Sequence, residues 1–270
     1  MLETIRVTPD YARRGAAAPA VPAELKVMLL PPVFASRTQR PMLIVVPGGG
    51  YCYTSPREAE PIAARFLAAG FHTAVLRYSC APSVWPTAAC ELAWSVRLMR
   101  ERAEEWGIDP HRVWVIGFSA GGHLACCLGT LWREAPLTLP EDTVSCRPDA
   151  QVLCYPVITL GEKTHPGSRD SLTGGDAALA EKLSLETRVT PDVPPTFLWH
   201  TQGDGSVPVE NSLMYAAALR RAGVPVELHV YERGGHGLAT ADAETATAPD
   251  QILPEVQGWI PLAVSFLQRR

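Results

Sequence analysis

The sequence lacks several features that would place it in other classes of protein. It has no apolar run of membrane-spanning length, and residues 1–6 contain an early acid, Glu3, with no apolar core of a secretory leader. It has no block of basic residues, and its formal net charge is −4 at pH 7. Nothing therefore predicts binding to nucleic acid or to an anionic membrane surface, and we expect a cytoplasmic protein.

Cysteine is present but forms no recognisable site. The chain has seven Cys, an odd number, and their spacing matches no metal-binding motif. Most lie inside apolar runs, as Cys126 and Cys127 do, which indicates buried free thiols in a reducing compartment. We therefore expect neither a metal site nor an organic cofactor.

The composition favours one folded domain. The chain has 270 residues, of which 47% are hydrophobic and 19% charged, as is typical of a globular enzyme with a buried core. Apolar runs of β type alternate with helical patterns, which predicts an α/β fold with a mostly parallel central sheet and helices on both faces. No linker or internal repeat is visible, so we predict a single domain over residues 1–270, with residues 1–24 as an N-terminal arm.

The alternation predicts the following elements. The expected strands are residues 25–30, 42–46, 73–78, 113–116, 150–154, 196–200 and 226–231. The expected helices are residues 57–69, 86–106, 120–132, 209–222 and 253–268, the second of which should end at Gly107. Residues 160–195 interrupt the pattern with several Gly and Pro residues and one short helical pattern at 177–185, so we expect a cap or a substrate loop there.

The most informative motif is the G-x-S-x-G sequence of residues 117–121. It directly follows the apolar run 112–116 and precedes a helix-compatible stretch, which is the context of a nucleophile elbow. A Cβ at Gly117 or Gly121 would collide with the neighbouring helix or strand, and the helix that starts at Ser119 points its positive dipole end at the reaction centre. The alternative interpretation is an ordinary glycine-rich turn.

A serine nucleophile needs a base, and the base needs an orienting carboxylate. In a fold with this elbow the order along the chain is Ser, acid, His. His236 follows the last expected strand in a glycine-rich loop that can carry its imidazole back over the elbow, so we predict that it is the base. The other histidines lie before the elbow, on its helix, in the insertion or inside strands: His72, His111, His123, His165, His200 and His229.

Asp204 is the favoured orienting acid. It follows the expected strand 196–200, and the carboxyl ends of parallel strands carry functional groups. Asp176 and Asp192 are alternatives by chain order, but neither follows a strand. Glu210 should lie in the first turn of the next helix, where an acid is favourable in any case.

Carbonyl chemistry also needs donors for a developing oxyanion. The Pro-Gly-Gly-Gly-Tyr sequence at 47–51 follows the expected strand 42–46 and supplies free backbone N–H groups, for which we name Gly49 and Gly50. The N–H of Ala120, next to the serine, supplies another. The alternative, a phosphate loop, lacks the Lys-Ser/Thr pair that should follow the glycines.

With these motifs assembled, the chain resembles the α/β-hydrolase superfamily from about residue 25 onward. More narrowly, it resembles the bacterial acetylesterase and xylan-esterase-like group, with BD-FAE and hormone-sensitive-lipase-type relatives. The resemblance rests on residues 47–51, 55–61, 77–79, 117–123, 194–197 and 235–238. It implies an α/β-hydrolase fold with a small insertion after the sixth strand, and the roles of nucleophile for Ser119, orienting acid for Asp204 and base for His236.

The chain departs from the lipase-type motif in one place. That motif begins H-G-G-G, whereas this sequence has Pro47 at the first position. The backbone donors survive this change, but a hydrogen bond from the missing histidine does not. Which N–H groups of residues 48–51 point inward therefore stays open.

The resemblance implies a serine esterase that acts on short acyl esters, with acetyl groups on a sugar or oligosaccharide as the expected substrate. Tyr51, Tyr53 and Trp85 could stack on sugar faces, although Trp85 fits a core position equally well. Loops 51–55 and 79–85 and the insertion should build the pocket mouth, and their polar composition favours acetyl over long acyl groups. The alternatives are a peptidase or arylformamidase with the same triad and, less favoured, an inactive hydrolase-fold binding protein.

Overall fold

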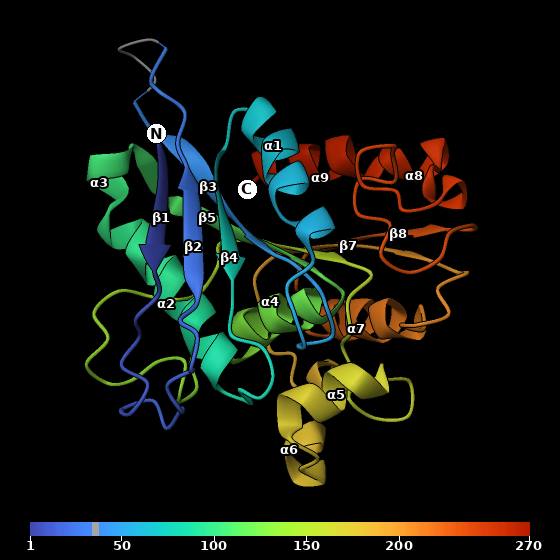
Figure 1. Ribbon diagram of the computed structural model, residues 1–270, viewed down its shortest axis with the longest axis horizontal. Helices are drawn as coiled ribbons and strands as arrows, with labels where there is room; N and C mark the ends of the chain where they lie inside the picture. The colour runs from blue at the N-terminus through green and yellow to red at the C-terminus, as the bar shows by residue number, and fades with distance from the viewer. Residues whose placement is uncertain (34–37) are drawn as a thin grey trace.

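Eight strands form one sheet in the order β1-β2-β4-β3-β5-β6-β7-β8 in the computed structural model, which describes residues 1–33 and 38–270 (Figure 1). The strands are β1 (Leu2–Arg6), β2 (Glu24–Met28), β3 (Arg40–Val46), β4 (His72–Arg77), β5 (Ile108–Phe118), β6 (Gln151–Cys154), β7 (Thr196–Thr201) and β8 (Val226–Tyr231). The pairs β1–β2 and β2–β4 are antiparallel, and the other pairs are parallel. The mostly parallel sheet that the sequence predicted is therefore present.

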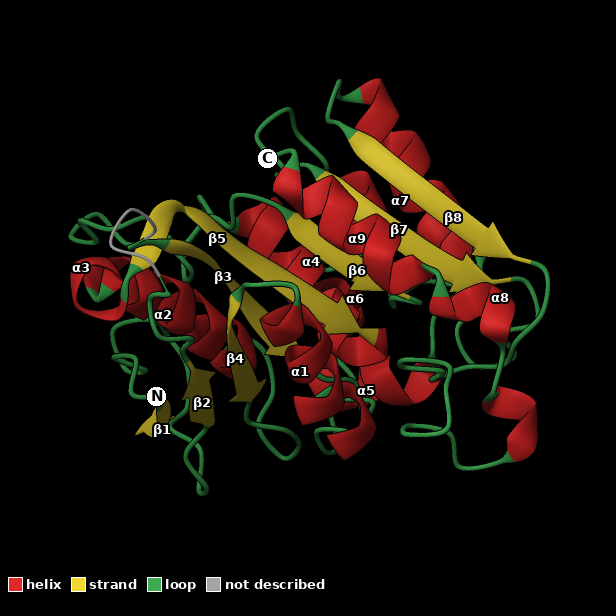
Figure 2. Cartoon of the chain, turned by 90° about the horizontal axis from the view of Figure 1, so that it is seen from above, coloured by secondary structure: helices red, strands yellow, loops and turns green. Residues whose placement is uncertain are grey.

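Alternate residues of the central strands pack into two separate hydrophobic cores, one on each face of the sheet. In β3, Ile44 packs into one core and Leu43 and Val45 pack into the other, as the period of two along a strand requires. Helices α2 (Thr87–Glu101), α4 (Ser119–Leu131) and α7 (Glu210–Arg221) cover one face of the sheet. Helices α1 (Glu60–Ala68) and α9 (Trp259–Gln268) cover the other (Figure 2). Both faces are thus covered, as parallel sheets require.

Strand β1 is a difference from the prediction, because its residues were assigned to an N-terminal arm. It pairs with β2 in the register Leu2 to Met28 and Arg6 to Glu24. Most of its side chains are exposed. An edge strand of this kind has no buried face, so it shows no alternation of apolar and polar residues.

Two predicted helices are each divided in two. The pattern at 86–106 forms α2 and α3 (Ala103–Trp106), and α3 ends at Gly107, which has the predicted left-handed conformation with φ 64°. The pattern at 253–268 forms α8 (Pro254–Gln257) and α9. Short 3-10 turns lie at Pro56–Glu58, before α1, and at Pro249–Gln251, before α8. Within the two described ranges, no helix has both the length and the apolar character to cross a membrane.

The insertion lies between β6 and β7 and carries α5 (Pro166–Thr173), α6 (Ala177–Lys182) and the 3-10 turn Leu185–Thr187. It leaves the sheet at the carboxyl end of β6, and its helices stand apart below α4 and α7 in Figure 1. Helix α6 matches the predicted pattern at 177–185. Helix α5 was not predicted, because its sequence is rich in Pro, Gly and Ser.

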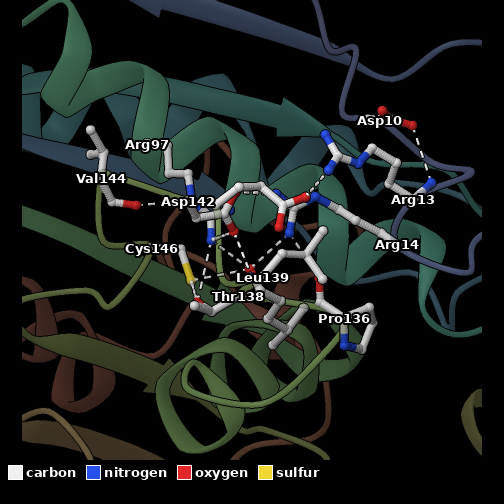
Figure 3. Close-up of polar contacts among 12 residues, drawn as sticks. Asp10, Arg13, Arg14, Arg97, Pro136, Thr138, Leu139, Asp142, Val144 and Cys146 are labelled. Carbon is white, nitrogen blue, oxygen red and sulfur yellow. Dashed lines mark hydrogen bonds and ion pairs between the residues drawn. The ribbon is translucent and has the colours of Figure 1, made fainter.

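An ion-pair cluster fastens part of the N-terminal arm to the domain (Figure 3). Asp142 Oδ1 lies 2.7 Å from Arg14 Nη2, and Asp142 Oδ2 lies 2.7 Å from Arg97 Nη2 of helix α2. Burial alone would raise the pKa of Asp142, but the two guanidinium groups and the backbone N–H of Leu139 hold it below its usual value. Residue 14 is therefore held against the loop that contains Asp142.

Candidate active site

Ser119 stands at the sharp turn between β5 and α4. Its φ of 52° lies in the left-handed region, which is strained for any residue except glycine. A Cβ on Gly117 would collide with the carbonyl oxygen of Gly121, and a Cβ on Gly121 would collide with that of Pro47 at the end of β3. The two glycines therefore permit the close approach that the G-x-S-x-G motif predicted.

The side chains of Ser119, His236 and Asp204 form a chain of hydrogen bonds. Ser119 Oγ lies 2.7 Å from His236 Nε2, and His236 Nδ1 lies 2.6 Å from Asp204 Oδ2. Asp204 follows β7 and His236 follows β8, so loops at the carboxyl ends of two parallel strands supply them. An ionised Asp204 accepts a hydrogen bond from Nδ1–H, which leaves the lone pair of Nε2 free to accept a hydrogen bond from the serine hydroxyl.

Asp204 is set up to stay ionised. Burial alone would raise the pKa of Asp204, but hydrogen bonds from His200 and His236 and from the backbone N–H of Val207 hold it well below its usual range. Its Oδ1 accepts from the N–H groups of Ser206 at 3.0 Å and Val207 at 2.8 Å. His200 Nε2 lies 3.3 Å from Asp204 Oδ2, a contact that the strand position of His200 did not suggest.

The alternative acids lie in other roles. Asp176 caps helix α6 by accepting from the N–H groups of Ala178 and Leu179. Asp192 forms an ion pair with Arg133, with 2.6 Å between Oδ2 and Nη1. Glu210 begins helix α7, as expected.

The glycine loop after β3 lies directly against the elbow. A Cβ on Gly48 would stand only 2.9 Å from Ser119 Cβ. The Gly48 N–H donates to Glu58 Oε2 at 2.9 Å, so it is not available as a donor to an oxyanion. The N–H groups of Gly49 and Gly50 have no acceptor among the residues that the structure describes, and both glycines line the pocket that contains Ser119. These two N–H groups can therefore serve as donors to a bound oxyanion.

Glu58 and Tyr155 were missed by the sequence analysis. Glu58 is 4% exposed, and its Oε1 accepts from the Tyr155 hydroxyl at 2.6 Å. That hydroxyl in turn accepts from the N–H of Ala239 at 3.0 Å, and the Tyr155 ring packs edge-on against His236. The glycine loop and the histidine loop are thus connected through two buried side chains. Glu58 lies in the 55–61 motif, which was the only sequence signal for it.

A pocket of about 370 Å³ opens above Ser119 and His236. Its walls include Tyr53, which is 60% exposed, and His165 of the insertion. Among the residues that the structure describes, those that line this pocket do not include Tyr51 or Trp85. Loop 79–85 contributes instead to a separate pocket of about 440 Å³ beside the N-terminal arm. No three His, Cys, Asp or Glu side chains of residues 1–33 and 38–270 are grouped so as to hold a metal ion.

Tyr51 and Trp85 have structural partners. The Tyr51 hydroxyl is 2.9 Å from His123 Nδ1, and His123 Nε2 is 3.0 Å from the carbonyl oxygen of Leu183 in the insertion. Burial lowers the pKa of His123 to about 4, so its imidazole is neutral and links the glycine loop to the insertion. Trp85 packs against the core, and its backbone N–H donates to the carbonyl oxygen of Leu172 in α5. Trp199, on β7, is fully buried.

Comparison with known proteins identifies the family. Residues 29–219 match the BD-FAE family model. Endo-1,4-beta-xylanase B of Butyrivibrio fibrisolvens is 36% identical over 213 residues, which are 76% of this chain and 34% of that protein. Acetylxylan esterase of Xylanibacter ruminicola is 29% identical over 81% of this chain and 45% of its own length. The chain thus spans less than half of each of these two relatives.

Solved structures resemble the whole chain. The acetyl ester-xyloside bifunctional hydrolase from Caldicellulosiruptor lactoaceticus has a TM-score of 0.87 and 36% identity, over 99% of this chain and 96% of that one. A carboxylesterase from Lactobacillus plantarum has a TM-score of 0.85 and 31% identity, over 100% and 97% of the two chains. The fold is the α/β-hydrolase fold, and the chain belongs to the BD-FAE family.

Proposed function

We propose that this protein is a serine esterase that removes short acyl groups, with acetyl groups on a carbohydrate as its substrate class. The observation that carries the proposal is the Ser119–His236–Asp204 chain, with links of 2.7 Å and 2.6 Å, at the floor of an open pocket. The acetyl and carbohydrate parts are supported by the names of its relatives, an acetylxylan esterase and an acetyl ester-xyloside hydrolase.

In the proposed acylation step, Ser119 Oγ attacks the ester carbonyl while His236 Nε2 takes the hydroxyl proton. The carbonyl oxygen becomes an oxyanion, which the N–H groups of Gly49, Gly50 and Ala120 stabilise. The bond between the carbonyl carbon and the alcohol oxygen then breaks, and His236 returns its proton to the leaving alcohol.

In the proposed deacylation step, water attacks the acylated Ser119 and loses a proton to His236. The bond from the acyl carbon to Oγ breaks, and the proton passes from His236 to Ser119. Asp204 stays ionised throughout and stabilises the imidazolium in both steps. The enzyme returns to its starting state with one carboxylic acid and one alcohol released.

The test combines labelling with a rate measurement. A fluorophosphonate should modify Ser119, and Ser119→Ala should lose both the label and about a millionfold of the rate on p-nitrophenyl acetate. Ser171→Ala, in helix α5, is the matched control and should keep both. Assay of acetylated xylo-oligosaccharides then tests the substrate class. Turnover by Ser119→Ala near the wild-type rate would reject the mechanism.

A further inference from the structure

His165 brings a second imidazole to the catalytic pocket from the insertion. It is half-buried at the start of α5 and lines the same pocket as Ser119 and His236. A Cβ built on Gly50 would stand 3.9 Å from His165 Cε1, so the ring edge lies beside the proposed oxyanion donors. The proposed ester hydrolysis gives this side chain no role.

The hydrogen bonds of His165 indicate which ring nitrogen carries the proton. The backbone N–H of Ser168 is shared between His165 Nδ1 and the His165 carbonyl oxygen, at 3.1 Å each, and its bond to Nδ1 needs a lone pair on that nitrogen. The Ser168 hydroxyl lies 2.9 Å from the same nitrogen. Burial, and then the nearby His236, lower the pKa of His165, which keeps the ring neutral. The single proton of the ring therefore resides on Nε2.

Nε2–H of His165 has no acceptor among residues 1–33 and 38–270. A bound acetyl ester offers few acceptors that could satisfy it. The acetyl group has only its carbonyl oxygen, which Gly49, Gly50 and Ala120 can already serve. The remaining acceptors of an acetylated carbohydrate are the hydroxyl and ether oxygens of its alcohol half.

We propose that His165 Nε2–H donates a hydrogen bond to an oxygen in the alcohol half of the ester, and so selects polyhydroxylated alcohols as leaving groups. His165 is then a specificity-determining residue, held in one orientation by its bond to Ser168. This inference rests on the proposed esterase function. It goes further in naming the residue that recognises the alcohol and the group that it recognises.

A matched pair of esters tests the inference. In 2-hydroxyethyl acetate a hydroxyl stands where propyl acetate has a methyl group, and the acetyl halves are identical. The wild type should prefer the hydroxy ester by about tenfold in kcat/KM, the value of one neutral hydrogen bond. His165→Asn should reduce this preference to near parity while its kcat/KM on propyl acetate stays within about twofold of the wild type.

Asn is the matched replacement because it is a favoured helix N-cap and can still accept the N–H of Ser168, but it cannot reach as far as the imidazole Nε2. His165→Gln has a longer side chain with its own N–H donors and should retain an intermediate preference. A thermal midpoint near that of the wild type checks that each variant is folded.

Each other outcome has a distinct meaning. An equal loss on both esters would show that His165 acts on the carbonyl or on the triad, and it would overturn the inference. So would an undiminished preference in His165→Asn, or a wild type that cleaves both esters equally. A wild type that cleaves neither these esters nor p-nitrophenyl acetate would reject the proposed function itself.

Discussion

Glu58 holds the backbone N–H of Gly48, with 2.9 Å between Oε2 and the nitrogen. In the lipase-type motif a histidine precedes the glycines, whereas this chain has Pro47. The Glu58 carboxylate, supplied from outside the loop, fixes the first glycine. Because Gly48 is thereby removed from the set of free donors, the choice left open by the sequence narrows to the N–H groups of residues 49–51.

Glu58→Gln should lower the activity although the two side chains have nearly the same size. The amide can accept from Gly48, but its NH₂ group then faces the Tyr155 hydroxyl, whose proton loses its acceptor at a cost of about 1–3 kcal/mol. We expect kcat on p-nitrophenyl acetate to fall by about tenfold to a hundredfold with little change in KM, because an interaction specific to the transition state is weakened.

Glu60→Gln is the control for this substitution. Glu60 lies two residues further along, in α1, and forms partly exposed ion pairs with Arg77 and Lys26. Loss of such pairs costs at most about 1 kcal/mol of stability, so kcat should stay near the wild-type value. Equal kcat values for Glu58→Gln and the wild type would show that the loop does not depend on this contact.

Asp204→Asn should reduce kcat by about ten-thousandfold, because an amide cannot hold the imidazole in the required tautomer. The same substitution at Asp192 or Asp176 should leave kcat nearly unchanged, since these residues pair with Arg133 and cap α6. The measurement is the rate on p-nitrophenyl acetate for the three Asn variants. An inactive Asp192 or Asp176 variant beside an active Asp204 variant would contradict the proposed assignment of the acid.

The parts of the molecule that the sequence predicted are those with a local pattern. The run 42–46 could be predicted as part of β3 because a strand buried on both faces is apolar throughout. The helix end at Gly107 could be predicted because glycine can adopt a positive φ. Ser119, Asp204 and His236 were proposed as a triad because each follows a strand in the chain order that a nucleophile elbow suggests. The structure brings their side chains within hydrogen-bonding distance.

The parts that were missed depend on contacts between distant segments. Nothing in the local sequence states that Glu58 will meet Tyr155, 97 positions later, or that Tyr51 will turn inward to His123. Tyr53, two residues beyond Tyr51, does face the pocket. Aromatic residues of one loop can therefore differ in role: Tyr51 is 2% exposed and contacts His123, whereas Tyr53 is 60% exposed.

The stability of the fold should depend on pH through His123. Burial lowers the pKa of His123 from 6.5 to about 4, so between these values the unfolded chain binds a proton that the folded protein does not. The contribution of His123 to the free energy of unfolding should therefore be fully retained above pH 6.5 and fall by about 3 kcal/mol as the pH drops to 4. Urea unfolding at a series of pH values measures this slope.

Two variants make the test specific to His123. His123→Gln should lose part of the slope and keep the part that comes from His72, whose pKa is also lowered to about 4 by burial. His111→Gln, at an exposed position, should behave as the wild type does. A slope that is unchanged in His123→Gln would mean that this imidazole does not stay neutral in the folded protein.

The acyl pocket should accept acetyl groups and reject long chains. The pocket of about 370 Å³ has walls that include Cys52, Tyr53, Ser55 and Arg57, and no Leu, Ile, Val or Phe of the described chain lines it. A longer acyl chain gains about 0.8 kcal/mol per buried methylene only where apolar side chains receive it. We expect kcat/KM on p-nitrophenyl esters to be highest for acetate, lower for propionate and butyrate, and poor at about eight carbons and beyond.

The Ser119→Ala variant, assayed in parallel, corrects each ester for hydrolysis that does not pass through the proposed nucleophile. A maximum at octanoate would require an apolar channel that opens only when substrate binds, and would place the enzyme among lipases.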